Sequence, residues 1–381
     1  MADYKKYQSD GVSAEDKALD KFAELMIEKI ESLKNSDGWK QPWFTEGSLR
    51  WPRNLSGREY NGMNALLLMM LCEKQNYKLP VFCTFNRAVG LNYTTDKQGA
   101  KKPITDTDGQ PLPRVSINKG ERSFPVMLTT FTVMDKDTKE KINYEEYKRL
   151  SNDEKSQYNV YPKLNVYQVF NVDQTNLKEA RPDLYAKLEA ENKLQRPFSG
   201  EGESFKFPAM DAMIAENKWI CPINLVHQDN AYFSISKNQI TLPEKSQFKD
   251  GESFYGTAFH EMTHSTGTAE MFNRFNPESG FGSAEYAKEE LVAELGSALV
   301  AQRYGMTKNL KDDSAAYLKS WLDSLKESPS FIKTTLMDVK RATSVITQRI
   351  DEVALELEAK QSQTNDKSVS MDAEAKVEKP Q

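Results

Sequence analysis

The stretch FHEMTHSTG, residues 259–267, decides how the rest of this sequence is interpreted. It holds His260, Glu261 and His264 in the pattern HExxH, and we expect it to lie on a helix over residues 252–266 that ends at Gly267. Residues four positions apart share one face of a helix, so both imidazoles can bind a single metal ion. The chain has only 3 histidines, which makes a chance match of this kind rare. The motif therefore predicts a zinc site.

The residue between the two histidines predicts what the site does. Glu261 follows one ligand directly, where its carboxylate can reach a water activated by the metal. As a general base it would take the proton of that water and so create a nucleophile for an amide carbonyl. We therefore expect one Zn²⁺ per chain and chemistry of the zinc-metallopeptidase type. The alternative is a surface helix with incidental histidines.

A catalytic zinc site takes three protein ligands and keeps one open position. Two downstream patterns compete for the third ligand. The metzincin spacing after His264 puts Glu270 where that family has a histidine. On the next expected helix, residues 284–304, Glu290 and Glu294 share a face in the E-x-x-x-E pattern of gluzincins. We expect Glu290 to bind the metal and Glu294 to accept a hydrogen bond from a liganding imidazole. The alternatives for the third ligand are Glu289, Glu294 and Glu270.

Three further residues are weighed by their place in the sequence. His227 precedes an expected strand pair, and we interpret it as a structural histidine. Tyr286 and Tyr304 are near the expected ligands in sequence and are candidates for stabilising an oxyanion.

The composition is that of a soluble globular protein, with 38% hydrophobic and 28% charged residues and a net charge of -5. The three cysteines, Cys72, Cys83 and Cys221, are sparse and odd in number, which favours a reducing compartment over a disulfide framework. The N-terminal residues lack the apolar core of a signal peptide, and no apolar run is long enough to span a membrane. We expect a cytoplasmic protein without membrane contact.

The pattern of apolar residues predicts an α+β protein of two domains. Residues 1–175 combine helices, at 14–33 and 64–73, with strands, at 81–85, 114–117 and 125–133. Residues 176–206 are interpreted as a connector and residues 207–358 as the domain that carries the HExxH helix. Residues 359–381 are polar, and we expect them to form a disordered tail.

Positive charge and aromatic rings gather in the first domain. Residues 39–130 contain 13 Lys and Arg against 7 Asp and Glu. Aromatic residues are interleaved with these charges. Cations for phosphates and flat rings for unstacked bases are typical of proteins that bind single strands with little sequence preference. The alternative is that the rings form an ordinary core.

Several segments together resemble the ArdC-type antirestriction proteins, over residues 15–355. The matching segments are WKQPW (39–43), PRNLSGREYNGMN (52–64), NKGER (118–122), YQVFNVDQ (167–174), AYFSISKNQITLP (231–243), FHEMTHSTG (259–267), GSAEYAKEELVAELGSA (282–298) and YLKSWLDSLK (317–326). The chain departs from the family at residues 93–113 and 135–159, which look like insertions. No primase carboxylate motif is evident, so primase activity is not carried over.

The resemblance implies an N-terminal single-stranded-DNA-binding module, shared with plasmid primases of the TraC type, and a C-terminal zincin-like metallopeptidase module of the gluzincin type. It also implies a mobile genetic element as the setting, with single-stranded DNA and a restriction system or protein substrate as partners. The residues that we expect to contact DNA are Trp39, Trp43, Trp51 and Tyr60 for stacking, and Arg53, Arg58, Lys119 and Arg122 for phosphates.

Two other functions remain open from the sequence. The chain could be an intracellular zinc metalloprotease whose first domain recognises protein, with no role in DNA binding. It could also be a DNA-binding protein whose metal is purely structural.

Overall fold

The computed structural model describes residues 13–35, 51–96, 98–192, 198–200, 205–275, 283–306, 318–327 and 329–375. The chain divides into two compact units. The N-terminal unit comprises residues 1–25, 53–58 and 79–191, and the C-terminal unit comprises residues 26–52, 59–78 and 192–381. One of the boundaries between the units falls within α1, Ala14–Asn35. Among the described residues, every helix is too short or too polar to cross a membrane.

A five-stranded sheet in the order β1-β2-β7-β5-β6 forms the centre of the N-terminal unit. Its strands pair antiparallel, except that β1 and β2 are parallel. Leu79, Val81, Val172 and Tyr185 are buried in its core. The elements of the unit are β1 (Arg53–Asn54), β2 (Val81–Thr84), α3 (Phe85–Gly90), β3 (Tyr93–Thr95), β4 (Lys101–Pro103), β5 (Phe124–Asp135), β6 (Lys141–Ile142), α4 (Tyr144–Arg149), α5 (Asn152–Lys155), β7 (Tyr158–Asn171), η1 (Val172–Gln174), α6 (Leu177–Ala180) and α7 (Pro182–Glu191).

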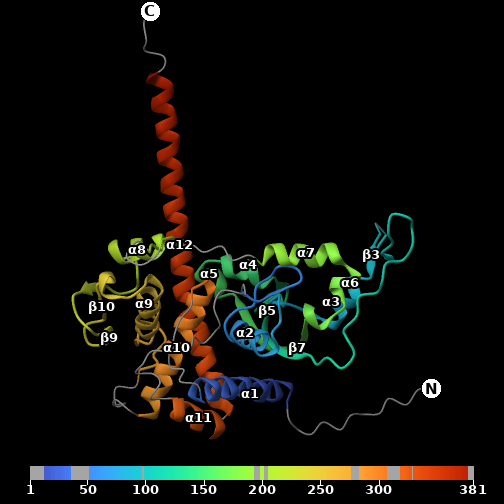
Figure 1. The fold of residues 1–381 in the computed structure, drawn as a ribbon, viewed down its shortest axis with the longest axis horizontal. Coiled ribbons are helices and arrows are strands. Elements are labelled where there is room, and N and C mark those ends of the chain that lie inside the picture. The colour runs from blue at the N-terminus through green and yellow to red at the C-terminus, as the bar shows by residue number, and fades with distance from the viewer. Residues whose placement is uncertain are drawn as a thin grey trace, which may run out of the picture. The chain divides into compact units, whose positions relative to one another are not determined.

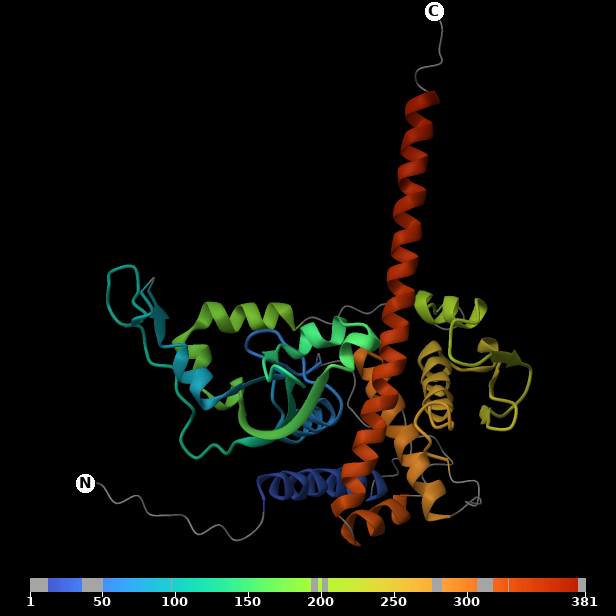
Figure 2. The same cartoon turned by 180° about the vertical axis from the view of Figure 1, so that it is seen from behind.

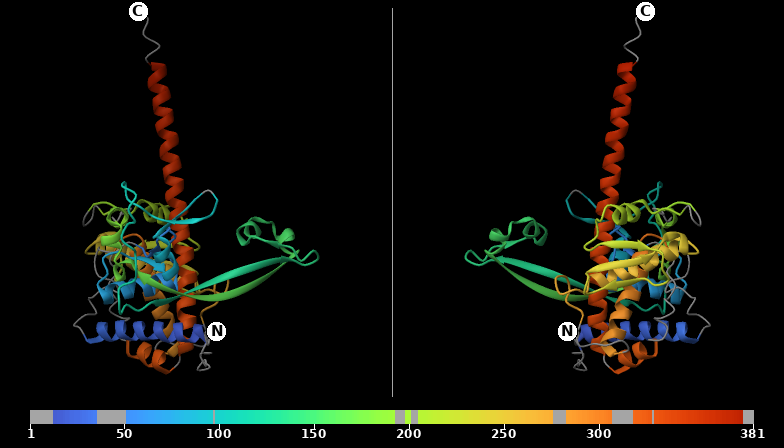
Figure 3. Two further views of the ribbon diagram at one scale, coloured as in Figure 1. Left: turned by 90° about the vertical axis from the view of Figure 1, so that its right-hand side faces the viewer. Right: turned by 90° about the vertical axis from the view of Figure 1, so that its left-hand side faces the viewer.

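Strands β5 and β7 are much longer than their neighbours in the sheet. β2 pairs with β7 only at residues 169–171, and β6 pairs with β5 only at residues 133–134. Between these places β5 and β7 form a two-stranded ribbon, residues 126–132 and 161–167, and α4 and α5 lie beyond its far end (Figure 3). The segment 135–159, which resembles an insertion in the sequence, is therefore the end of a hairpin.

The strand expected at residues 114–117 is absent, and only an isolated bridge joins Ile117 to Thr175. The reason is that a side chain replaces the neighbouring strand. The amide of Asn92 accepts a hydrogen bond from the backbone nitrogen of Val115 at 2.7 Å and donates one to its carbonyl at 3.0 Å. A backbone that is satisfied in this way has no need of a β ladder.

The C-terminal unit is built from helices around a three-stranded sheet in the order β8-β10-β9. β10 runs parallel to β8 and antiparallel to β9. α9 and α10 lie side by side, and α12 packs along α10 (Figure 1). The elements are α2 (Met63–Gln75), α8 (Pro208–Ala215), β8 (Ile223–Val226), β9 (Tyr232–Ser234), β10 (Gln239–Pro243), η3 (Lys245–Gln247), α9 (Gly251–Ser265), α10 (Ala284–Arg303), α11 (Leu318–Glu327) and α12 (Pro329–Ala375).

Two features of the C-terminal unit differ from the sequence analysis. α2, which was assigned to the first domain, belongs to this unit, because its apolar side chains are buried on all sides and it packs against α12. α12 continues to Ala375, across residues that were assigned to a disordered tail (Figure 2). Residues 359–375 include three Ala, two Lys and two Gln, and such residues favour helix even without an apolar face.

The close approach of α9 and α10 depends on Gly296. A Cβ atom at Gly296 would lie 2.9 Å from Cγ2 of Thr263, which is fully buried and β-branched. Since Thr263 has little freedom to move, the two helices would have to separate. We expect Gly296→Ala to lower the free energy of unfolding by about 1–3 kcal/mol, measured by chemical denaturation.

Gly90 provides a matched control for that substitution, because nothing lies within 4 Å of a Cβ atom built there. Gly90→Ala should leave the unfolding free energy nearly unchanged. Equal losses in both variants would show that the helix contact at Gly296 is not tight.

Candidate metal centre

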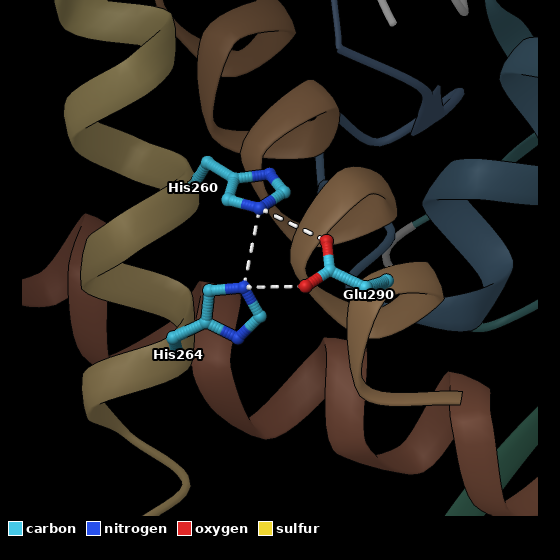
Figure 4. A group of neighbouring side chains, drawn as sticks. All are labelled: His260, His264 and Glu290. Carbon is cyan, nitrogen blue, oxygen red and sulfur yellow. Dashed lines mark hydrogen bonds and ion pairs between the residues drawn. The ribbon is translucent and has the colours of Figure 1, made fainter. Parts of the chain in front are cut away.

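Three predicted ligands meet at one point between α9 and α10. The ligand atoms of His260, His264 and Glu290 all lie within 4.8 Å of one another (Figure 4). The two Nε2 atoms are 3.1 Å apart, and the Glu290 carboxylate lies 3.5 Å from the first and 3.6 Å from the second. Within the described residues this is the one group of His, Cys, Asp and Glu side chains with such geometry.

The two helices bring these side chains together for local reasons. Asp250 caps α9 by accepting a hydrogen bond from the backbone nitrogen of Ser253 at 2.6 Å, and Ser283 caps α10 by accepting one from Tyr286 at 3.1 Å. The ligands of α9 are four residues apart and so face the same side. Glu290 is buried on α10, which is apolar around most of its circumference over residues 291–301. The site therefore lies between two buried helices.

Each imidazole has a second carboxylate behind it. Nδ1 of His260 lies 3.4 Å from Glu294, which has no exposed surface. Nδ1 of His264 lies 3.1 Å from Glu289. A carboxylate that accepts the Nδ1 proton leaves the lone pair on Nε2 free to bind a metal ion. Both Nε2 atoms belong to the group of three ligands and lie 3.1 Å apart.

Arg274 binds the carboxylate behind His264. Its Nε and Nη2 atoms donate to the two oxygens of Glu289 at 2.9 and 2.8 Å. The same guanidinium donates to the hydroxyl of Thr266 at 2.9 Å and to the carbonyl of Thr263 at 2.8 Å. These contacts tie the segment after α9 to the first turns of α10.

The electrostatics favour protonated histidine when no cation is bound. Burial by itself lowers the pKa of His264. The hydrogen bond with Glu289 and the negative charges of Glu290 and Glu261 outweigh burial and raise this pKa above its ordinary range. Burial likewise acts to raise the pKa of Glu289, but Arg274 and His264 outweigh it and hold the carboxylate ionised. A cation that binds here must displace a proton.

The donor set suits a divalent cation of the zinc kind. Two imidazoles and one carboxylate converge, and further carboxylates stand behind the rings, as outer hydrogen-bond partners do in such sites. Three protein ligands leave a position open for water or substrate. Glu261, predicted as the general base, is 2% exposed on α9 next to His260.

Other candidates from the sequence lie elsewhere. Glu270 is exposed beyond the end of α9 and does not belong to the ligand group. Tyr304 is buried, and its hydroxyl donates to Asp351 at 2.8 Å, so it packs in the core instead of facing the ligands. Tyr286 is half-buried one turn before Glu290. His227 has an exposed side chain 3.6 Å from Glu244 and is not a core residue.

The predicted DNA contacts fall into three groups. Trp39 and Trp43 lie outside the described residues. Trp51 is buried, donates from Nε1 to the carbonyl of Tyr60, and has the guanidinium of Arg303 5.5 Å from its ring centre. Tyr60 is half-buried, and Arg53 pairs with Glu191 at 2.7 Å. The residues that remain exposed are Arg58, Lys119 and Arg122.

Two residues of the site were not identified from the sequence in the role that they have here. The sequence alone suggests Glu289 only as an alternative ligand and gives no role to Arg274. A usable signal existed, because a buried carboxylate needs a cation and Arg274 and Lys288 are the only basic residues between His264 and Glu289.

Comparisons with known proteins define the class of this protein. Residues 208–336 match the family of zincin-like metallopeptidases, and residues 16–170 match the N-terminal domain of the anti-restriction factor ArdC. The chain is therefore an ArdC-type protein, and the expected α+β architecture of two domains is confirmed.

Solved structures agree in fold. The metal-free antirestriction ArdC protein from plasmid R388 superposes with a TM-score of 0.58 at 22% identity, covering 88% of this chain and 98% of that chain. The Mn(II)-bound structure of that protein gives a TM-score of 0.58 and covers 87% and 97%. At this identity the likeness establishes the fold alone.

Among curated proteins, two DNA primases TraC from Escherichia coli are similar. One is 28% identical over 353 residues, covering 90% of this chain and 20% of that protein. The other is 25% identical over 365 residues, covering 95% and 29%. The chain thus spans between a fifth and a third of the length of these relatives.

Proposed function

We propose that the C-terminal unit is a zinc-dependent peptidase and that the N-terminal unit binds single-stranded DNA, together serving antirestriction for a mobile genetic element in the cytoplasm. One observation carries the enzymatic part. Three protein ligands, His260, His264 and Glu290, converge within 4.8 Å beside the buried Glu261. Tyr286, one turn before Glu290, is the remaining candidate for stabilising an oxyanion.

The residues divide the work of hydrolysis. A bound divalent cation supplies Lewis acidity, which polarises a carbonyl and makes water more acidic. Glu261 accepts the proton of the attacking water and later returns it to the leaving amine. Glu294 and Glu289 hold the two imidazoles with Nε2 turned to the cation.

A purely structural metal fits this site less well. Structural zinc sites are usually closed by four protein ligands, and the ligand group found in the described part of the chain has three. Cleavage of fluorescently labelled unfolded casein by the zinc-loaded protein, abolished by a chelator and restored by zinc, tests the enzymatic proposal.

The names of the relatives support the DNA part, since they are an anti-restriction factor and DNA primases. The surface of the N-terminal unit adds support. Arg58, Lys119 and Arg122 are exposed and available for phosphates. Because Trp51 is buried, the rings for stacking must lie elsewhere.

The β5–β7 ribbon offers such rings. In the strand register Tyr161 pairs with Thr132, Lys163 with Thr130 and Tyr167 with Val126. The three β7 positions are two and four residues apart, and because every second residue of a strand faces the same side, their side chains share one face. Tyr161 is 52% and Tyr167 42% exposed. Lys163 is the only charged residue in residues 124–134 and 158–171, so the only carboxylate on these two strands is Asp135, at the far end of β5.

We expect Tyr161→Ala and Tyr167→Ala each to weaken binding of a thymidine oligonucleotide by about 1–3 kcal/mol, because each removes one stacking ring. Fluorescence anisotropy at low salt measures the affinity of the full chain. The melting temperature should stay close to that of the parent protein, since both rings are exposed.

Trp51→Ala is the matched control. Its ring is 9% exposed, so its loss should lower stability by roughly 3–5 kcal/mol. Unchanged affinity in both tyrosine variants of a protein that does bind the oligonucleotide would place the DNA on another surface. A protein that binds none at all would favour the protease without a role in DNA binding.

A further inference from the structure

We propose that Arg274 is a positioning residue of the metal centre, which acts through Glu289 to orient His264 and to reserve the ligand position for Glu290. The inference rests on the proposed metal-dependent function and goes beyond the ligand group itself. Its basis is a continuous set of contacts from the end of α9, through one guanidinium, to the ring of a ligand.

Arg274 reaches the site because the chain folds back after α9. The chain turns back after α9, and the carbonyl of Gly267 accepts hydrogen bonds from the backbone nitrogens of Arg274 at 2.9 Å and Phe275 at 3.3 Å. A Cβ atom at Gly267 would lie 2.9 Å from the ring of Phe275. The glycine of the HSTG segment therefore permits the turn that carries Arg274 back to the metal helices.

The guanidinium of Arg274 is held firmly in place. Four of its contacts are hydrogen bonds of 2.8–2.9 Å: two to Glu289, one to Thr266 and one to the carbonyl of Thr263. Its side chain is 5% exposed and that of Glu289 is 12% exposed. A forked pair of this kind fixes direction as well as charge, because the guanidinium is planar.

The pair of Arg274 and Glu289 determines which carboxylate is left to bind the cation. Glu289 and Glu290 are neighbours on α10, and either carboxylate could bind a cation. Arg274 takes both oxygens of Glu289, one of which also lies 3.1 Å from Nδ1 of His264. Glu289 is thereby committed to the ring, and Glu290 is left as the third ligand. Without Arg274, Glu289 would be a buried carboxylate without its cation and would be free to turn toward the metal.

Zinc affinity, measured by competition with a fluorescent chelator, tests this directly without any assay of activity. We expect Arg274→Leu to weaken zinc binding by roughly 10–100-fold, as loss of an outer hydrogen-bond partner does. Arg274→Lys keeps the positive charge but cannot form the two parallel hydrogen bonds to Glu289, so its zinc affinity should lie between those of Arg274→Leu and the parent protein. Lys288→Leu, the control, removes a neighbouring cation that pairs with Asp338 at 3.3 Å, and should bind zinc normally.

A double-mutant cycle separates positioning from general support of the fold. If Arg274 acts through Glu289, then Arg274→Leu should cost little further zinc affinity in a protein that already carries the nearly isosteric Glu289→Gln. Equal losses in both backgrounds, or normal zinc binding by Arg274→Leu, would overturn the inference. A parent protein that binds no zinc would instead refute the proposed function. Circular dichroism of each variant confirms that it is folded, and Arg274→Lys serves if the leucine variant is not.

Discussion

Glu261→Gln should retain its zinc and lose peptide cleavage by about 10²–10⁴-fold, the usual contribution of a general base. The amide has nearly the shape of the carboxylate but cannot accept the proton of the attacking water. Glu261 is 2% exposed, so a residue of the same size is needed to keep the packing of α9. Zinc content after gel filtration and the rate of cleavage of labelled casein measure the two effects on one sample.

Glu270→Gln is the matched control for that experiment. It makes the same chemical change at an exposed carboxylate outside the ligand group, and cleavage should continue at the parental rate. Undiminished cleavage by the Glu261 variant would remove this residue from the mechanism. Loss of zinc from the Glu261→Gln variant would mean that Glu261 supports the structure of the metal site instead of accepting a proton from water.

The parts of the site that are local in sequence could be predicted from it. His260 and His264, and likewise Glu290 and Glu294, are spaced by one helical turn, and helix geometry alone fixes which side they face. The structure accordingly places His260, His264 and Glu290 together, with Glu294 behind the ring of His260. The family resemblance carried by these motifs was confirmed as well.

The parts that depend on tertiary packing could not be predicted in the same way. Arg274 contacts Glu289 only because the chain folds back after Gly267, and no periodicity encodes such a turn. Trp51 lies in a segment rich in Arg and Asn, yet Arg303, far away in sequence, covers its ring. The position of α2 in the C-terminal unit follows from its contact with α12, which is equally remote in sequence.

The identity of the third ligand gives the other large effect. We expect Glu290→Ala to weaken zinc binding by more than the roughly 10–100-fold that loss of an outer partner costs, because it removes a donor from the cation itself. His260→Ala and His264→Ala should each release the metal for the same reason. Titration against a fluorescent chelator, with metal content of the purified protein, measures the loss.

Glu270→Ala decides between the two spacings that the sequence left open. Glu290 faces both Nε2 atoms at 3.5 and 3.6 Å, whereas Glu270 is exposed beyond the end of α9. Glu270→Ala should therefore bind zinc as the parent does. If Glu270→Ala weakened zinc binding more than Glu290→Ala does, the third ligand would be Glu270, at the metzincin spacing. Equal zinc content in the parent and in the double variant His260→Ala/His264→Ala would show that zinc binds elsewhere. If zinc binding needs Glu290 and not Glu270, α9 supplies the two imidazoles of the metal centre and α10 supplies the carboxylate. The two helices that form the core of the C-terminal unit then also build its metal centre.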